Sequence, residues 1–431
     1  MTSVPNAVSQ RLRPGKEPAP GAPVRRRVTL PVVLLILAGG LLLFSVARVV
    51  TGEQSLTQTA QWSSALSYAV PIGLAGLGGL WAERAGVINI GLEGMMMLGM
   101  FAAGWIGWQY GPWAAVVAGI VGGALGGLLH ALATVTFGVD HIVSGVAINI
   151  LALGVVQFLA KLWFGAEGSE AAALGGNDKQ SPQMDPMTPF TVPGVSDWLG
   201  DLAAKRWFLV SDAAGILGAA VRQVSWLTLL AVALFVVSYV VLWRTSFGLR
   251  LRSCGENPQA TESLGVNVYV YKYAALAVSG ALAGLGGAYL AVLIRMYQDG
   301  QTGGRGYLGL ATMIFGNWRP GGVATGAGLF GFTDSLQNRG GGDTVHAALL
   351  LFALALAAWA VWQFTRGRHR AAAVCLVVAA LLALWYATTD TMPSEMVSAT
   401  PYLTTLLVLA LFSQRLRPPK AIGKPYRRGE E

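Results

Sequence analysis

The chain has few charged residues, and this shortage decides its class. Asp, Glu, Lys and Arg together make up 12% of the 431 residues, whereas 54% are hydrophobic. A soluble domain carries about 25% charged residues, because water contacts its whole surface. This composition excludes a soluble globular enzyme and a disordered protein, and it favours a protein embedded in a membrane.

The chain also lacks the residue clusters that build metal sites and disulfide frameworks. It contains two cysteines, Cys254 and Cys375, which lie far apart without a C-x-x-C pair. Its four histidines are scattered. We therefore expect no zinc site, no other metal site and no disulfide scaffold.

Motifs for nucleotide binding and catalysis are missing as well. The sequence has no G-x-x-x-x-G-K-[ST], no H-E-x-x-H and no G-x-S-x-G. We therefore expect no cofactor in this chain and no catalytic site of its own. The net charge of +9 is typical of Lys and Arg on cytoplasmic loops of a membrane protein, so we expect no nucleic-acid partner.

Long apolar runs are what the sequence does contain. Most have the roughly 20 residues that a helix needs to cross a bilayer, and we expect an all-α polytopic membrane protein with about 10–12 transmembrane helices. The transmembrane domain covers 30–415, between a disordered basic tail at 1–29 and a basic tail at 416–431. The runs are 30–50, 62–82, 87–109, 112–136, 142–164, 224–243, 273–294, 306–317, 321–338, 344–364, 371–388 and 400–415.

The distribution of Lys and Arg predicts the orientation. If these segments alternate from a cytoplasmic N-terminus, most of the 30 Lys and Arg residues fall on cytoplasmic segments, above all in the two tails. Both termini are then cytoplasmic. Residues 165–222 form a long polar extracytoplasmic loop, and residues 244–272 form a cytoplasmic loop.

Two features predict an inverted repeat with broken helices. The sequence Ala-Gly-Leu-Gly-Gly at 75–79 recurs at 283–287, and the predicted orientations of the two segments are opposite. The run 306–317 is too short to span a bilayer and leads into a break at 316–322. Such an element is tolerated at membrane depth where it is buried or lines a cavity.

A few polar residues within the apolar segments are candidates for a substrate path. Asn89 and Glu93 are four residues apart, and we expect them on one face of a helix. Asn149 and Asp334 are similar polar residues in other segments. A carboxylate at membrane depth faces protein or a wet cavity. Contacts that hold helices together are the alternative role for each of them.

The loop 244–272 predicts a docking helix. Asn257 and Pro258 are typical of a helix start and Gly265 of its end, so a helix of two turns is expected between them. A helix this short is suited to a groove on a partner protein. The candidate residues are Glu256, Asn257, Ala260, Leu264 and Gly265.

Several longer strings, taken in order, resemble a known family. They are ERAGVINIGLEGMM (83–96), DHIVSGVAINI (140–150), TSFGLRLRSCGENPQATESLGVNVYVYK (245–272), SGALAGLGGAYLA (279–291) and GRGYLGLATMIFGNWRPGG (304–322). These strings are similar to inner-membrane permeases of ABC importers in the branched-chain amino acid and simple-sugar superfamily, especially the nucleoside-import group. The resemblance implies that 255–268 holds the coupling helix, which seats in a separate ATPase subunit.

The resemblance also implies a role and a set of partners. The chain is expected to be a multi-pass permease subunit in the cell membrane that moves nucleosides by alternating access. Its implied partners are the ABC ATPase subunit, a second homologous permease and an extracytoplasmic substrate-binding lipoprotein. Ribose, other simple sugars and branched-chain amino acids are alternative substrates. A proton-coupled secondary transporter that uses Glu93 or Asp334 is the alternative of another class.

Overall fold

The computed structural model describes residues 30–427 except residues 394, 401–402, 405 and 407–415. Within these described ranges the chain folds into helices, with only isolated β-bridges beside them. Eight of the described helices are long and apolar enough to cross a membrane. The predicted all-α polytopic membrane fold is therefore confirmed.

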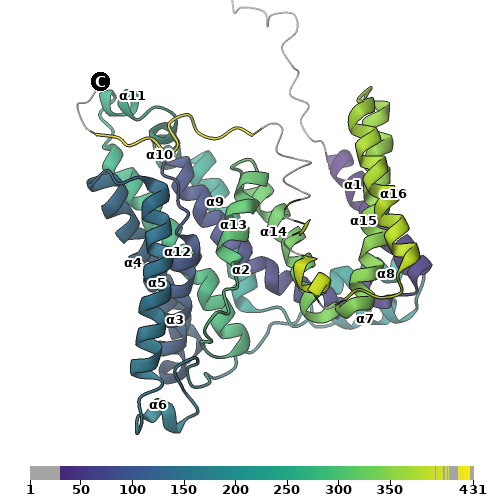
Figure 1. Cartoon of the computed structure of the whole chain (residues 1–431), viewed down its shortest axis with the longest axis horizontal. Helices are drawn as coiled ribbons and strands as arrows, with labels where there is room; N and C mark the ends of the chain where they lie inside the picture. The colour runs from purple at the N-terminus through teal and green to yellow at the C-terminus, as the bar shows by residue number, and fades with distance from the viewer. Residues whose placement is uncertain (1–29, 394, 401–402, 405, 407–415, 428–431) are drawn as a thin grey trace, which may run out of the picture.

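Long helices build the body of the molecule, and short ones lie at its two ends (Figure 1). The long helices are α1 (Leu30–Thr51), α2 (Thr59–Arg84), α3 (Leu92–Tyr110), α4 (Pro112–Ala131), α5 (His141–Trp163), α9 (Trp226–Arg244), α12 (Val268–Ile294), α14 (Pro320–Ser335), α15 (Gly341–Thr365) and α16 (His369–Thr388). The body also contains one short helix, α13 (Arg305–Phe315). The short helices are α6 (Glu170–Ala173), α7 (Val195–Ala204), α8 (Val210–Gly218), α10 (Ser246–Glu256) and α11 (Pro258–Ser263).

The short helices define two opposite faces of the molecule (Figure 1). Helices α10 and α11 lie at one end together with the C-terminal segment, and we call this end the α11 face. Helices α6, α7 and α8 lie at the other end, which we call the α8 face. The predicted loop 165–222 thus contains short helices, and it lies opposite the loop 244–272.

Two predicted boundaries are changed by the structure or lie beyond it. The run expected at 87–109 begins as a helix only at Leu92, because residues 85–91 form a non-helical connection from α2. The short element expected at 306–317 is confirmed as α13, and a break separates it from α14. The tail 1–29 and most of the run 400–415 lie outside the described residues.

The inverted repeat is visible in how α2 and α12 cross. A Cβ atom on Gly78 of α2 would lie 2.5 Å from the carbonyl oxygen of Ser279 in α12. A Cβ atom on Gly286 of α12 would lie 3.1 Å from the carbonyl oxygen of Pro71 in α2. Positions in the two repeats correspond when they are as far apart in sequence as the two Ala-Gly-Leu-Gly-Gly copies. Gly78 then corresponds to Gly286, and Pro71 corresponds to Ser279. Each contact is therefore the image of the other, as a two-fold axis between antiparallel copies requires.

The helix that follows each copy repeats this relation. Helix α3 packs on α12 where Gly99 meets Gly284, and α13 packs on α2 where Thr312 meets Gly76. A second pair of contacts joins Met100 to Gly287 and Met313 to Gly79. The same number of residues separates Gly99 from Thr312 and Met100 from Met313. Helices α3 and α13 are therefore equivalent in the two repeats.

Glycines let α4 and α12 approach until their backbones touch. Gly119, Gly123 and Gly127 line one stripe of α4, and they lie against the backbone around Gly280 and Gly284 of α12. Four residues separate each of these glycines of α4 from the next, so they lie on one face of the helix. Small residues in such a stripe are what allows close packing of helices in a membrane.

Replacing Gly123 with isoleucine should destabilise the fold. A Cβ atom there would overlap the carbonyl oxygen of Gly280, and backbone atoms cannot move aside as a flexible side chain can. We expect the midpoint of thermal unfolding in detergent to fall by at least about 3 °C, since overpacking costs roughly 1–3 kcal/mol. Gly154→Ile is the matched control, because nothing lies within 4 Å of a Cβ atom at Gly154. Equal midpoints for the two variants would contradict this packing.

Candidate functional site

Two breaks in the helices meet inside the bundle. Residues 85–91 connect α2 to α3, and residues 295–304 connect α12 to α13. The side-chain amide of Asn89 in the first break donates a 2.9 Å hydrogen bond to the hydroxyl of Ser279, near the middle of α12. Backbone groups at such a depth have no water to pair with, so protein groups must satisfy them.

Two histidines hold the backbone of the first break. The ring Nε2 of His130 donates to the carbonyl oxygen of Ile88 at 2.9 Å, and its Nδ1 accepts from Ser144 at 2.8 Å. The backbone N–H of Ile88 donates to Nδ1 of His141 at 3.3 Å. The backbone N–H and the carbonyl oxygen of Ile88 are thus both paired with buried histidine side chains, one from α4 and one from α5.

Asn149 of α5 satisfies the start of α3. Its side-chain oxygen accepts from the backbone N–H of Gly94 at 2.8 Å. Its amide donates to the carbonyl oxygen of Ile90 at 3.1 Å and to the hydroxyl of Tyr307 at 3.0 Å. The first free N–H groups of a helix need partners of this kind. Asn149 therefore serves as a cap supplied by a neighbouring helix.

Glu93 of α3 makes the equivalent contact to the second break. One carboxylate oxygen accepts from the N–H of Gly304 at 3.0 Å, and the other accepts from the N–H of Gly306 at 2.6 Å. These amides lie at the start of α13, where the helix dipole favours a negative charge. Glu93 is 2% exposed, so this bond is shielded from water. The carboxylate joins the two repeats at their breaks.

An ion pair completes the second break. Arg305 donates through Nε and Nη2 to one carboxylate oxygen of Asp334 in α14, at 3.1 and 2.7 Å. The other oxygen of Asp334 accepts from Asn338 at 3.0 Å. The Arg305 guanidinium also lies over the ring of Tyr68. The charges of Arg305 and Asp334 therefore balance each other.

The predicted path residues do come together, although their local geometry differs from the prediction. Asn89 and Glu93 do not share a helical face, because Asn89 lies in the non-helical connection before α3. The reason is tertiary: buried partners on α4, α5 and α12 pair the backbone that a helix would otherwise pair itself. All four predicted residues are buried. Their role in a substrate path stays a prediction.

Tyr307 is the residue of this cluster that sequence reasoning missed. It is 48% exposed, while its hydroxyl is bonded to the buried Asn149. The signal that could have found it is the run Gly303-Gly304-Arg305-Gly306, in which three glycines surround one basic residue beside an apolar helix. Tyr307 offers an aromatic face and a hydroxyl on the accessible side of the break.

The arrangement suits binding more than catalysis. The carboxylates of Glu93 and Asp334 are paired, and the cluster presents amide and hydroxyl groups beside an aromatic ring. Within the described ranges, no group of three or more His, Cys, Asp or Glu residues could hold a metal ion. An uncharged polar solute could hydrogen bond here without disturbing an ion pair.

The second candidate site is α11, whose predicted start and end are confirmed. The side-chain oxygen of Asn257 accepts from the N–H of Ala260 at 3.0 Å, as an N-cap does. Pro258 occupies the first helical position. Gly265 follows with a φ of 80°, a value that favours glycine. Leu264 is 83% exposed, so an apolar side chain projects from the end of the helix.

Helix α10 connects α11 to the first break. A Cβ atom on Gly255 would lie 3.0 Å from the backbone nitrogen of Gly86, and it would overlap the carbonyl oxygen of Arg84. Glu256 follows and ends α10. Burial raises the pKa of the Cys254 thiol to about 11, so this neighbour stays uncharged. Helix α10, which leads into α11, thus packs with its backbone directly against residues 84–86.

Two grooves flank α11 on the α11 face. One has a volume of about 350 Å³ and is lined by residues of α10 and α11 together with Arg84. The other has a volume of about 420 Å³ and lies between α11 and the C-terminal segment. A short exposed helix with a groove on each side is a shape that a partner protein can enclose.

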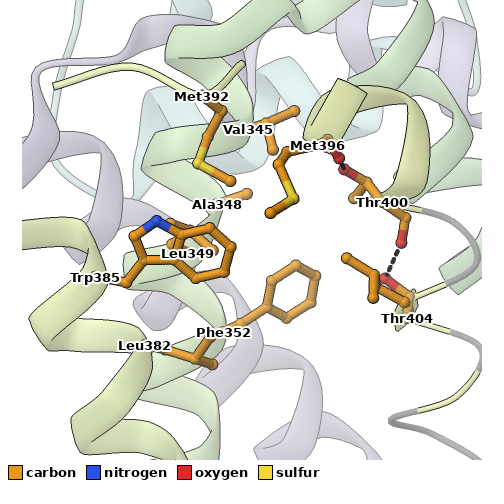
Figure 2. A pocket seen from close by; sticks show the side chains of 11 residues that line it. Val345, Ala348, Leu349, Phe352, Leu382, Trp385, Met392, Met396, Thr400 and Thr404 are labelled. Atoms are coloured by element: carbon orange, nitrogen blue, oxygen red, sulfur yellow. Dashed lines mark hydrogen bonds between the residues drawn. The ribbon is translucent and has the colours of Figure 1, made fainter. Parts of the chain in front are cut away.

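A separate apolar cavity lies between α15, α16 and the segment after α16 (Figure 2). Figure 2 shows Phe352, Trp385 and Met396 pointing into it. The hydroxyl groups at its edge, on Thr400 and Thr404, donate to backbone carbonyl oxygens instead. The cavity therefore offers little to a polar solute, and the cluster around the breaks remains the better candidate.

Removing the Glu93 carboxylate should destabilise the junction of the two breaks. Glu93→Leu leaves the half-buried N–H of Gly304 and the buried N–H of Gly306 without their acceptors, and a buried unpaired group costs about 1–3 kcal/mol. We expect a clearly lower midpoint of thermal unfolding for Glu93→Leu. Glu93→Gln keeps one acceptor oxygen, so its midpoint of thermal unfolding should fall less. An unchanged midpoint in Glu93→Leu would contradict the capping role.

Comparison with known proteins places the chain among transport proteins. Residues 61–358 match the family model described as the permease component of branched-chain amino acid transport systems. No solved structure matches the chain.

Relatives in several prokaryotes are similar over most of their length. The guanosine ABC transporter permease protein NupQ of Bacillus subtilis (strain 168) is 32% identical, over 85% of this chain and 95% of its own. The nucleoside ABC transporter permease protein NupC of Lactococcus lactis subsp. cremoris is 31% identical, over 84% of this chain and 94% of its own. The putative glucose ABC transporter permease protein TsgC13 of Haloferax volcanii is 33% identical, over 62% of this chain and 73% of its own.

The family match spans both breaks, α10 and α11, so it includes all of the candidate residues. The chain is a multi-pass membrane protein, and it belongs to the family of permease components of branched-chain amino acid transport systems.

Proposed function

We propose that this permease is the membrane subunit of an ABC importer and that it moves nucleosides into the cell. The observation that carries the proposal is α11, a capped helix with an exposed apolar end whose support reaches the first break. In a chain that has no nucleotide-binding motif, a separate ATPase needs such a docking surface to drive a conformational change. We infer the substrate class from the guanosine and nucleoside permeases to which the chain is similar.

The chemistry of the breaks supports an uncharged substrate. A nucleoside carries an uncharged ribose and an aromatic base, which hydroxyl, amide and aromatic groups can bind. Tyr307 offers its ring and its hydroxyl beside the break, and Asn149 holds that hydroxyl in place. A free amino acid would need charge partners for its amine and its carboxylate. The charged groups of the junction, Glu93, Arg305 and Asp334, already have partners within the protein.

The orientation and the remaining partners are part of the same proposal. The α11 face is cytoplasmic and both termini lie on that side, in agreement with the Lys and Arg distribution. The α8 face then receives an extracytoplasmic substrate-binding lipoprotein. A second, homologous permease forms the other half of the pathway, and the bilayer surrounds the pair.

The proposed mechanism is alternating access. Binding of ATP closes the ATPase dimer and moves α11 with α10. Because Gly255 packs on residues 84–86, the motion reaches the first break, and Glu93 carries it to the second break. The two repeats then change their relative tilt and open the pathway to the other side. Substrate binding and ATP binding each favour one state.

A proton-coupled secondary transporter is less well supported. Its coupling residue would have to gain and lose a proton during transport. Both carboxylate oxygens of Glu93 accept backbone N–H groups, and Asp334 is paired with Arg305. Both carboxyl groups therefore have partners within the junction that account for their burial.

Uptake by the reconstituted complex tests the proposal. The permease, its ATPase, the second permease and the binding protein are placed in vesicles, and a labelled panel of nucleosides, ribose, glucose and leucine is supplied. We expect nucleoside uptake only with ATP on the α11 side, and no loss of uptake when the proton gradient is removed. Uptake of leucine or a sugar in preference to nucleosides would contradict the substrate. Uptake that persists without ATP would contradict the transporter class.

Replacing Ala260 with arginine should uncouple ATP hydrolysis from transport. Ala260 is exposed on α11, and a long charged side chain there would keep the helix from seating in a groove of the ATPase. We expect uptake to fall by a factor of roughly 30, the effect of about 2 kcal/mol on docking. Ala260→Ser is the matched control and should behave as wild type. Normal substrate-stimulated ATP hydrolysis and uptake in Ala260→Arg would remove α11 from the coupling path.

A further inference from the structure

The C-terminal segment runs across the α11 face, and we call residues 416–427 the C-terminal strap. Figure 1 shows the strap passing beneath α11 and close to α10. From its composition this segment was expected to be only a basic tail. Ala421 and Tyr426 of the strap are buried, however, and Lys420 and Lys424 are exposed. The strap is therefore packed against the protein on one side.

Backbone hydrogen bonds tie the strap to both sides of the α10 junction. The N–H of Ala421 donates to the carbonyl oxygen of Gly255 at 2.9 Å. The N–H of Gly423 donates to the carbonyl oxygen of Gly86 at 3.1 Å. Because Gly255 already packs on Gly86, three backbone segments meet here without side chains between them.

The strap also reaches the residue that the two histidines hold. Gly423 has a φ of 73°, and a Cβ atom on it would lie 2.8 Å from Cδ1 of Ile88. Ile88 is the residue whose backbone N–H and carbonyl group are bonded to His141 and His130. The strap thus continues the support of the first break on the α11 face.

Tyr426 joins the strap to α11 itself. Its hydroxyl donates to the carboxylate of Glu262, and its ring packs against Tyr269 with the centroids 5.7 Å apart. The ammonium group of Lys272 lies 5.5 Å from the centroid of the same ring. A hydrogen bond to a carboxylate is stronger than one between neutral groups. Tyr426 therefore fixes α11 to the start of α12.

The other end of the strap contacts the break between α13 and α14. The N–H of Arg417 donates to the side-chain oxygen of Asn317 at 2.8 Å. Asn317 and Trp318 both have positive φ values, 52° and 53°, which are uncommon for residues other than glycine. The indole N–H of Trp318 donates to Glu83 near the end of α2. One strap thus contacts the first break, the break between α13 and α14, and the docking helix.

We propose that the C-terminal strap positions α11 and makes it move with the first break as one unit, with Tyr426 and Glu262 as the positioning pair. The inference rests on the proposed function, because it assumes that α11 receives the work of an ATPase. Without the strap, α11 would turn about its short links to α10 and α12. The ATPase would then hydrolyse ATP while moving the breaks less.

Conservative variants of the pair test the strap. Tyr426→Phe keeps the ring and removes the hydroxyl, and Glu262→Gln removes the charge of the acceptor. In the reconstituted complex we expect each variant to raise the ATP hydrolysed per nucleoside imported by a factor of roughly 5, the effect of about 1 kcal/mol. The double variant should show little further rise, because both changes remove one interaction. Arg370→Ala, an exposed basic residue at the start of α16, is the control.

A second measurement does not depend on transport. Hydrogen exchange of the purified permease should show faster exchange across α11 in Tyr426→Phe than in wild type and in Arg370→Ala. The positioning role would be overturned if both single variants hydrolysed as much ATP per imported nucleoside as wild type, or if hydrogen exchange across α11 were unchanged. If wild type shows no ATP-driven uptake but the exchange differs as expected, the proposed function fails while the strap's hold on α11 stands.

Discussion

The structure depends on one constraint, that backbone N–H and carbonyl groups inside a membrane must be paired with protein. Continuous helices meet it by themselves, whereas the breaks at 85–91 and 295–304 cannot. Buried side chains supply the missing partners: His130 and His141 for Ile88, Asn149 for the start of α3, and Glu93 for the start of α13. These four buried polar residues therefore lie where the helices are interrupted.

This constraint links the interior to the α11 face. The first break is held from within by side chains and from outside by α10 and the C-terminal strap. Its backbone contacts Gly255 of α10 directly. In the proposed mechanism, a solute near Tyr307 and an ATPase on α11 therefore act on the same element. Coupling of two sites requires such a shared two-state element.

Much of the fold could be predicted because its signals are local. Apolar runs mark the long helices, and Asn257, Pro258 and Gly265 mark α11 by their own backbone preferences. The helical face assigned to Asn89 and Glu93 was wrong because the connection 85–91 is stabilised by residues far away in sequence. Tyr307 was missed for the same reason, since only the folded chain brings it to Asn149. The strap was hidden because backbone bonds, to Gly86 and Gly255, leave no pattern in its side chains.

A structure of the complete complex would test the central claim, that work enters through α11 and reaches the joined breaks. The account predicts that Leu264, 83% exposed in the isolated chain, is buried in a groove of the ATPase. It also predicts that Glu93 still accepts from Gly304 and Gly306 in both the nucleotide-free and the ATP-bound states, while residues 84–91 shift together with α11. An ATPase that docks elsewhere and leaves α11 in water would contradict the account, as would an α11 that moves while residues 84–91 stay in place.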